Sequence, residues 1–213
     1  MRRRSMLLLA VFIGVSAAVP VRAQTFGQYA GARTLPPNGH AAGAYMDMSS
    51  NLLAVMGQLR FSFYPDVDFG FQGGLGRYDL GGSDVTTARL GADFKLLAAK
   101  VSNGAAIDLS FGAGIGLESG EDFSQLSLGP LLTGSCPIVM ARSFDLEPYV
   151  SIGALFSRVD AGATDANDVS FPVRLGTEIP LMPGTRAVAE LRLRLGDAFN
   201  DNVGVGFGAN FDF

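Results

Sequence analysis

The last thirteen residues of the chain, Asp201 to Phe213, read DNVGVGFGANFDF. Every odd position from 203 to 213 is apolar, and every even position from 204 to 212 is glycine or a polar residue. Because side chains alternate across a β-strand, one face of this segment is wholly apolar and the other is small or polar. A final strand with a bare apolar face needs a partner sheet or lipid against it. The segment therefore predicts a terminal β-strand in an all-β fold.

The N-terminus has the pattern of a secretory signal peptide. Residues 2–4 are all arginine, and an apolar run from Met6 to Val19 follows them. We expect cleavage after Ala23, because the run is too short for a spanning helix and is flanked as a signal peptide is. Residues 24–40 are then expected to form a flexible N-terminal arm, and residues 41–213 to form one domain.

Composition narrows the class of protein. Removing residues 1–23 takes away four of the 16 basic residues and none of the 20 acidic ones, so the net charge falls from −4 to −8. This charge argues against nucleic-acid binding, which requires a basic face. The single cysteine, Cys136, cannot form an internal disulfide. Export without a spanning helix leaves two options, a soluble exported domain or a closed β-barrel in an outer membrane.

Alternating segments separated by turn residues fill the chain after residue 40. Their length, about ten residues or more each, is typical of tilted barrel strands. They predict a single closed antiparallel barrel of about 10 strands in up-and-down order, with strands near 41–49, 52–64, 67–78, 85–98, 105–117, 124–136, 145–157, 168–179, 186–196 and 202–213. Pro130, Pro148 and Pro172 fall inside these strands, where proline removes a ladder donor. They indicate either bulges or an alternative count of eight strands.

The direction of the alternation separates a membrane barrel from a soluble, lipocalin-like one. Glycine is frequent on the polar face, whereas phenylalanine and leucine dominate the apolar face. Because the inside of a small barrel is narrower than its outside, the glycine-rich polar face is predicted to face inward and the apolar face to contact lipid. With an even strand count, both ends of the barrel domain lie on the periplasmic side.

Charged residues on the inward face are the first candidate functional group. Residue parity places there Asp47 and the following eleven: Arg60, Arg89, Asp93, Lys95, Asp108, Glu147, Arg174, Glu178, Glu190, Arg192 and Arg194. Folding adjacent strands predicts that Lys95 lies near Asp108 and that Arg174 lies near Glu190. Charges inside a narrow barrel must be paired or hydrated. The balanced signs favour a structural network that fills the lumen over a narrow path for small solutes or ions.

Other candidate sites are weaker. The predicted outer loops are acidic, and clustered carboxylates there are a candidate site for divalent cations, although a solvated surface is favoured. His40 is the one histidine, and it lies at the start of the first strand, so a hydrolytic site at the outer rim would lack its base. We therefore expect no catalytic site, no cofactor, no metal centre and no enzymatic activity.

The signal peptide, the alternating strands and the terminal Phe-Asp-Phe together resemble the small OmpA/OmpX-type outer-membrane β-barrel proteins of Gram-negative bacteria. The resemblance covers about residues 41–213. It implies contact with outer-membrane lipid and insertion by the barrel assembly machinery, which would recognise the last strand through Phe207, Phe211 and Phe213. It implies no substrate. A structural or surface-interaction role is therefore expected, with a narrow porin-like channel as the alternative.

Overall fold

The computed structural model of the protein describes residues 24–79, 84–121, 123–140, 144–161, 164–195 and 203–213. Most of these residues belong to β-strands. The elements are β1(His40–Ser49), β2(Leu52–Tyr64), β3(Val67–Asp79), β4(Asp84–Ala99), η1(Val101–Asn103), β5(Asp108–Gly120), β6(Phe123–Ser135), β7(Ile138–Met140), β8(Phe144–Gly153), β9(Leu155–Ala161), β10(Thr164–Met182), β11(Thr185–Leu195) and β12(Val203–Asp212). Within the described ranges, no helix is long and apolar enough to cross a membrane.

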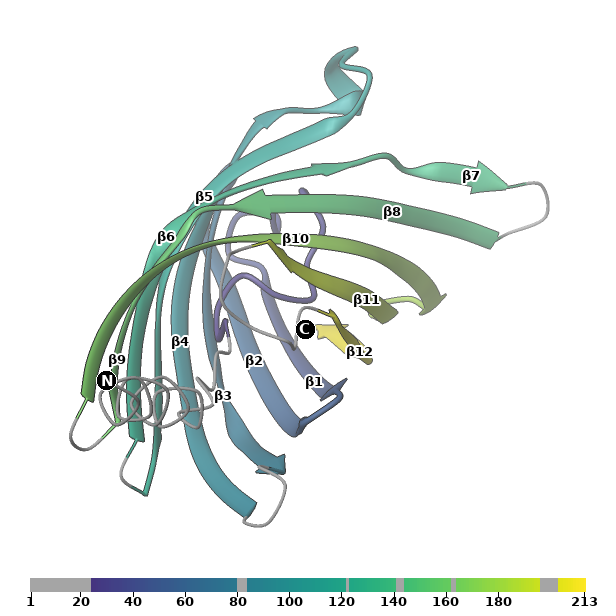
Figure 1. Ribbon diagram of the computed structural model, residues 1–213. Helices are drawn as coiled ribbons and strands as arrows, with labels where there is room; N and C mark the ends of the chain where they lie inside the picture. The colour runs from purple at the N-terminus through teal and green to yellow at the C-terminus, as the bar shows by residue number, and fades with distance from the viewer. Residues whose placement is uncertain (1–23, 80–83, 122, 141–143, 162–163, 196–202) are drawn as a thin grey trace, which may run out of the picture.

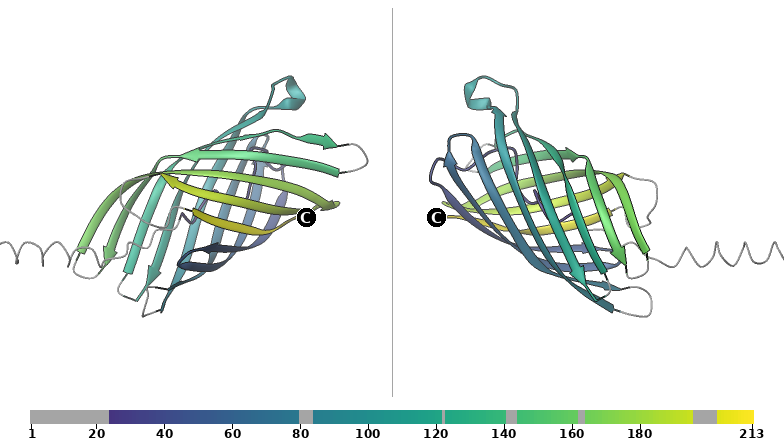
Figure 2. Two further views of the ribbon diagram at one scale, coloured as in Figure 1. Left: turned by 45° about the vertical axis from the view of Figure 1, so that its right-hand side comes forward. Right: turned by 90° about the vertical axis from the view of Figure 1, so that its left-hand side faces the viewer.

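The strands close into one antiparallel barrel (Figures 1 and 2). β6 and β7 are two parts of one interrupted strand, and β8 and β9 are two parts of the next, because all four pair in one continuous register. With these counted as two strands, each strand pairs with its neighbours in sequence. β12 returns to pair with β1, from Ala41 opposite Asp212 to Ser49 opposite Gly204. The barrel therefore has ten strands in up-and-down order, as the sequence predicts, and the alternative of eight strands is excluded.

Two of the three strand prolines coincide with interruptions rather than with a lost strand. Ala154, which separates β8 from β9, donates its N–H to the Pro130 carbonyl, 3.3 Å away. Cys136, in the gap between β6 and β7, donates in the same way to Pro148 at 3.1 Å. Proline has no backbone N–H, so the second hydrogen bond that each residue pair would normally form is missing. The regular strand pairing is therefore interrupted there. Pro172 lies within β10, opposite Arg194.

Most strand boundaries lie within three residues of the predicted ones; β5, for example, is shifted by three residues, and larger differences occur between β9 and β10. The predicted eleven-residue loop from Arg158 to Asp168 is wrong, because β9 continues to Ala161 and β10 begins at Thr164. Aspartates at 160, 165 and 168 interrupt the apolar alternation there, and this pattern was interpreted as a loop. These residues instead pair directly, with Asp165 opposite Asp160.

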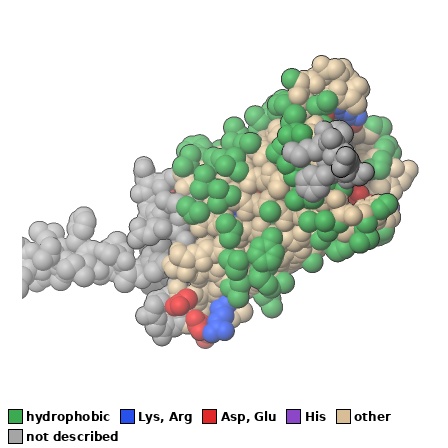
Figure 3. Space-filling view, turned by 90° about the vertical axis from the view of Figure 1, so that its right-hand side faces the viewer, with side chains coloured by type: hydrophobic (Ala, Val, Ile, Leu, Met, Phe, Trp, Pro, Cys, Tyr) green, Lys and Arg blue, Asp and Glu red, His purple; other side chains and the backbone are tan. Residues whose placement is uncertain are grey.

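The two faces of the wall have the predicted orientation. Large apolar side chains such as Leu59, Phe71 and Phe156 are about half exposed on the outside, and polar side chains are buried inside. Figure 3 shows one outer face on which hydrophobic side chains are abundant and charged ones few. Below, the end of the barrel at which β1 begins and β12 ends is called the proximal end, and the opposite end is called the distal end.

Candidate functional site in the barrel lumen

The inward-facing charges predicted from parity do lie in the lumen. Arg89 and Arg174 are 1% and 2% exposed, although each carries a full positive charge. Arg60, Asp93, Lys95, Asp108, Glu178 and Glu190 are also buried, whereas Glu147, Arg192 and Arg194 are partly buried. Buried charges of this kind are stable only when they are paired or hydrogen-bonded. The contacts of these groups therefore define the site.

The distal half of the lumen holds a self-contained ion cluster, formed by Asp47, Arg89, Glu118 and Arg192 and called the distal cluster below. Arg89 Nε lies 3.2 Å from Glu118 Oε1, and Arg192 Nη1 lies 2.9 Å from Asp47 Oδ2. Arg89 Nη1 lies 3.9 Å from the same Asp47 oxygen and so links the two pairs. Thr87 donates to Glu118 at 2.6 Å. Four strands are thereby cross-linked across the lumen by charged groups that pair with one another.

The proximal half has a second cluster of charged side chains. Arg60 pairs with Asp68 and lies 2.9 Å from Asp93 Oδ1, and Lys95 Nζ lies 3.6 Å from Asp68 Oδ2. Asp68 was not among the predicted lumen residues, although it falls within the predicted strand 67–78. The structure places it inside β3, where its side chain is 1% exposed.

One of the two predicted side-chain pairs is wrong. The register sets Lys95 opposite Gly112, and the ion partner of Lys95 is Asp68 rather than Asp108. Arg174 does interact electrostatically with Glu190, as predicted, although it lies opposite Arg192 and donates its hydrogen bonds to the carbonyls of Phe26 and Gly27. Strand parity correctly identified which side chains face inward. It could not identify all of their partners, because a further segment of chain occupies the lumen between them.

That segment is residues 24–35, called the arm below, and it differs from the flexible periplasmic arm expected from the sequence. It enters at the proximal end and runs inside the barrel (Figure 1, purple). Gln24, Thr25, Phe26, Gln28, Tyr29 and Ala32 are all buried. A turn closed by a Gly39 N–H to Pro36 carbonyl bond of 2.8 Å connects the arm to β1. The arm therefore packs as part of the interior of the barrel.

Side chains of the wall bind the arm mainly through its backbone. The N–H groups of Gly27, Tyr29 and Gly31 donate to Asp93, Glu190 and Glu178 at 3.0, 3.2 and 2.7 Å. In the other direction, Lys95 donates to the carbonyls of Gly31 and Arg33, and Arg174 donates to those of Phe26 and Gly27. Asn210 donates to the Tyr29 carbonyl at 3.1 Å. Most of the proximal charges therefore bind peptide groups.

Glycines of the wall make the space for the arm. A Cβ at Gly91, Gly114, Gly116 or Gly206 would lie less than 3.0 Å from an atom of Thr25, Phe26 or Tyr29. Real Cβ atoms do not approach other heavy atoms that closely. These inward-facing glycines thus shape a seat for the arm rather than an open channel.

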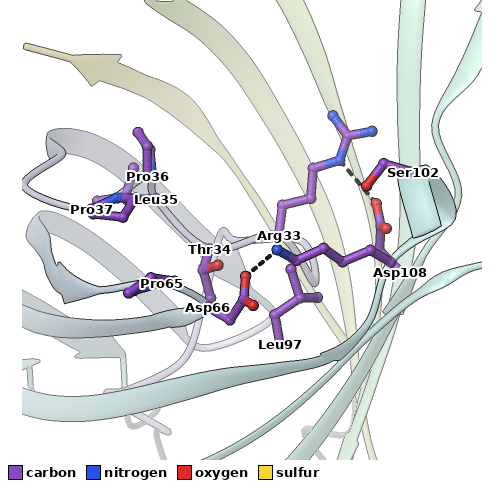
Figure 4. A pocket seen from close by; sticks show the side chains of 11 residues that line it. Arg33, Thr34, Leu35, Pro36, Pro37, Pro65, Asp66, Leu97, Ser102 and Asp108 are labelled. Carbon is purple, nitrogen blue, oxygen red and sulfur yellow. Dashed lines mark hydrogen bonds and ion pairs between the residues drawn. The ribbon is translucent and has the colours of Figure 1, made fainter.

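The proximal mouth contains a cavity of about 510 Å³. It is lined by residues 33–37 at the end of the arm, by the β2–β3 turn and by the segment between β4 and β5. Figure 4 shows Arg33 extending to Asp108, and its Nε lies 2.9 Å from Asp108 Oδ2. Burial lowers the pKa of Arg33, but the hydrogen bond to Asp108 and the charge of Glu147 outweigh it and raise the pKa above its usual value. Lys100 pairs with Asp66 across the same cavity. The charges of the mouth are thus already matched in sign.

Deeper in the lumen the packing between arm and wall is close. A void of about 20 Å³ remains between Gly27, Ala30 and the strands around Asp93 and Lys95. That volume has room for about one water molecule.

The remaining candidate residues are distributed as follows. His40 stacks on Phe213 with ring centroids 5.9 Å apart, at the seam where the barrel closes. Cys136 is an exposed free thiol. Phe207, Phe211 and Phe213 are exposed on the outside of β12 and the residue after it. Among the residues that the structure describes, no three His, Cys, Asp or Glu side chains are grouped as metal ligands. Ala23, the predicted cleavage position, lies outside the described residues.

Comparison with known proteins supports the fold and adds no specific function. No family model matches the chain, and no curated protein matches its sequence. Among solved structures, the β domain of the Bordetella autotransporter BrkA is similar, with a TM-score of 0.57 and 11% identity over 82% of this chain and 98% of that one. A bacterial polysaccharide outer membrane secretin has a TM-score of 0.50 and 12% identity, over 82% of this chain and 69% of that one. The chain therefore has the fold of bacterial outer-membrane β-barrels.

Proposed function

We propose that the chain is an integral outer-membrane β-barrel protein with a structural or surface-interaction role and a closed lumen. The half-exposed leucines and phenylalanines of the outer face support contact with lipid, because a water-exposed surface rarely carries so continuous an apolar cover. In this orientation the proximal end faces the periplasm. The proposed role requires no catalysis, and release of fatty acid from purified outer-membrane lipid by the protein would count against it.

The observation that supports a closed lumen best is the burial of its ions. Arg89 and Asp47 in the distal half are 1% and 0% exposed, and the arm fills the proximal half. A conducting path would leave such groups hydrated. The cavity of about 510 Å³ at the proximal mouth favours the alternative, a narrow porin-like channel for small solutes or ions. It would serve as the entrance of such a channel, which the arm blocks further in.

Single-channel recording in a planar bilayer separates these two functions. The closed barrel predicts no stable conductance steps, whereas the channel predicts steps of constant size. Arg192→Ala sharpens the test, because Arg192 pairs with the fully buried Asp47 in the distal cluster. We expect this variant to be less stable and still silent. Arg158→Ala, which removes an exposed arginine of β9, is the matched control. Wild-type steps that grow in Arg192→Ala and not in Arg158→Ala would support the channel.

We also propose that β12 is the assembly signal and that the protein is of the OmpA/OmpX type. The outward-facing Phe207, Phe211 and Phe213 support this, since they are presented at the strand that closes the barrel. Phe213→Ala should lower the fraction of protein with folded, heat-modifiable mobility in cells. An unchanged folded fraction would argue against recognition of β12 by the assembly machinery.

A further inference from the structure

The contacts of the arm have the form of peptide recognition. Three carboxylates, on Asp93, Glu190 and Glu178, accept hydrogen bonds from every second N–H group of the arm between residues 27 and 31. The segment is bent rather than extended, since Gly27 and Tyr29 have φ angles of 63° and 57°. Backbone hydrogen bonds of this kind do not depend on the side chains of the bound segment, so they would hold a peptide that can adopt the same bent backbone.

Two aromatic side chains give the arm its specificity. Phe26 is fully buried over Gly114 and Gly116. Tyr29, three residues later, stacks on Tyr45 with ring centroids 4.1 Å apart and planes 9° apart. A Cβ at Gly206 would collide with the Tyr29 ring, so the seat requires glycine at that position. The site thus has two aromatic pockets at a fixed separation along the chain.

The charged groups of the proximal half are also better partnered when a peptide is bound than when it is absent. Among the residues that the structure describes, four cations of the wall face six carboxylates, which are Asp68, Asp93, Asp108, Glu147, Glu178 and Glu190. These cations are Arg60, Lys95, Arg174 and Arg186. The N–H groups of the arm and the Arg33 guanidinium supply the missing donors. Without an occupant, this half would hold buried carboxylates with too few partners, which is costly.

We propose that the proximal half of the lumen is a peptide-binding site. It is occupied here by residues 24–35, and it can take in trans a bent, glycine-containing peptide with aromatic side chains three residues apart. The contacts that hold the arm come from hydrogen bonds to its backbone and from Phe26 and Tyr29, and none of them needs the covalent link to β1. The inference does not depend on whether the barrel conducts, because peptide occupancy and ion conductance are measured separately.

Cutting the link to β1 tests the proposal in the folded, full-length protein. A site-specific protease sequence is inserted between Pro37 and Asn38, both exposed at the proximal end, and is cut after the protein has been purified in detergent. A fluorescent synthetic peptide of residues 24–37 is then added at roughly 100 μM, below the effective concentration of a short tether. We expect the peptide to co-elute with the cut barrel and to bind the uncut barrel at least tenfold less. The same peptide with Phe26→Ala and Tyr29→Ala should bind the cut barrel at least tenfold more weakly.

Two results would overturn the proposal in this assay. One is equal binding of the labelled peptide to cut and uncut barrels, which would place it on the exterior or in the detergent. The other is no binding to a cut barrel that keeps its folded, heat-modifiable mobility.

A second measurement covers the case in which cutting unfolds the barrel. Trypsin can cleave the intact chain after Arg33, the only lysine or arginine between residues 24 and 59. Gly114→Leu fills the Phe26 pocket and should expel the arm, so that cleavage at Arg33 becomes at least tenfold faster. Gly73→Leu is the matched control, because a Cβ there makes ordinary contacts of 3.4 and 3.7 Å with Leu90 and the Arg89 carbonyl. Equal cleavage rates in Gly114→Leu and Gly73→Leu would reject the peptide site.

Discussion

The two halves of the lumen use the same residue types in different ways. In the distal half, Arg89, Glu118, Asp47 and Arg192 bind one another. In the proximal half, Arg174, Glu178 and Glu190 bind the backbone of the arm. The distal half is therefore complete without any further chain, whereas the proximal half is complete only when a peptide segment lies in it. One barrel wall can thus contain both a plug made of its own side chains and a seat for a ligand.

The size of the inward side chains explains the difference. Around the distal cluster the wall presents Tyr78, Gln125 and Arg89, whose volume spans the lumen. At the level of the arm it presents glycine at positions 91, 114, 116 and 206. A barrel of about eight strands is just filled by its side chains, and ten strands leave extra width. Glycine at these four positions converts that width into space for a second chain.

Arg89→Gln should have the largest effect on stability, because it breaks the distal cluster. Removing one partner of a buried ion pair leaves uncompensated charge on Glu118 and Asp47, and such changes cost about 3–5 kcal/mol. The measurement is urea unfolding of the protein in lipid vesicles. Arg77→Gln is the control, since Arg77 and Asp84 form an exposed pair that should contribute little to stability. A loss below about 1 kcal/mol for Arg89→Gln would show that the cluster does not hold the distal half together.

Arg174→Gln makes the same substitution in the proximal half and should cost less. It removes hydrogen bonds to the carbonyls of Phe26 and Gly27, and an unpartnered buried group costs about 1–3 kcal/mol. The distinguishing readout is the arm. Trypsin cleavage after Arg33 should accelerate in Arg174→Gln and stay unchanged in Arg89→Gln. If both variants released the arm equally, the two halves would form one cooperative unit and the comparison above would be wrong.

The sequence predicted the wall of this barrel far better than its contents. Strict alternation in segments such as Val203–Phe213 fixes which side chains face inward, because the period of a strand admits only two orientations. The ten strands and the inward set from Arg60 to Arg194 follow from that. The arm could not be placed in the same way, since residues 24–35 have no alternation and an isolated segment gives no register. Glycines on adjacent strands at one level, such as Gly91 and Gly116, were the available signal, and they were interpreted only as evidence of which face points inward.

Added calcium should have the smallest effect on stability. It tests whether the exposed carboxylates of the distal rim stabilise the protein, as the buried distal cluster is expected to do. The rim carboxylates of Asp84 and Asp165 are paired with Arg77 and Arg158, the latter pair at 3.3 Å. Ca²⁺ needs six or more oxygen ligands, and the described part of the rim brings no three such acidic side chains together. We therefore expect roughly 1 mM CaCl₂ to leave the thermal midpoint unchanged relative to NaCl of equal ionic strength. A calcium-specific rise in the midpoint would assign a divalent-cation site to the outer loops, because a ligand stabilises a fold only through the state that binds it.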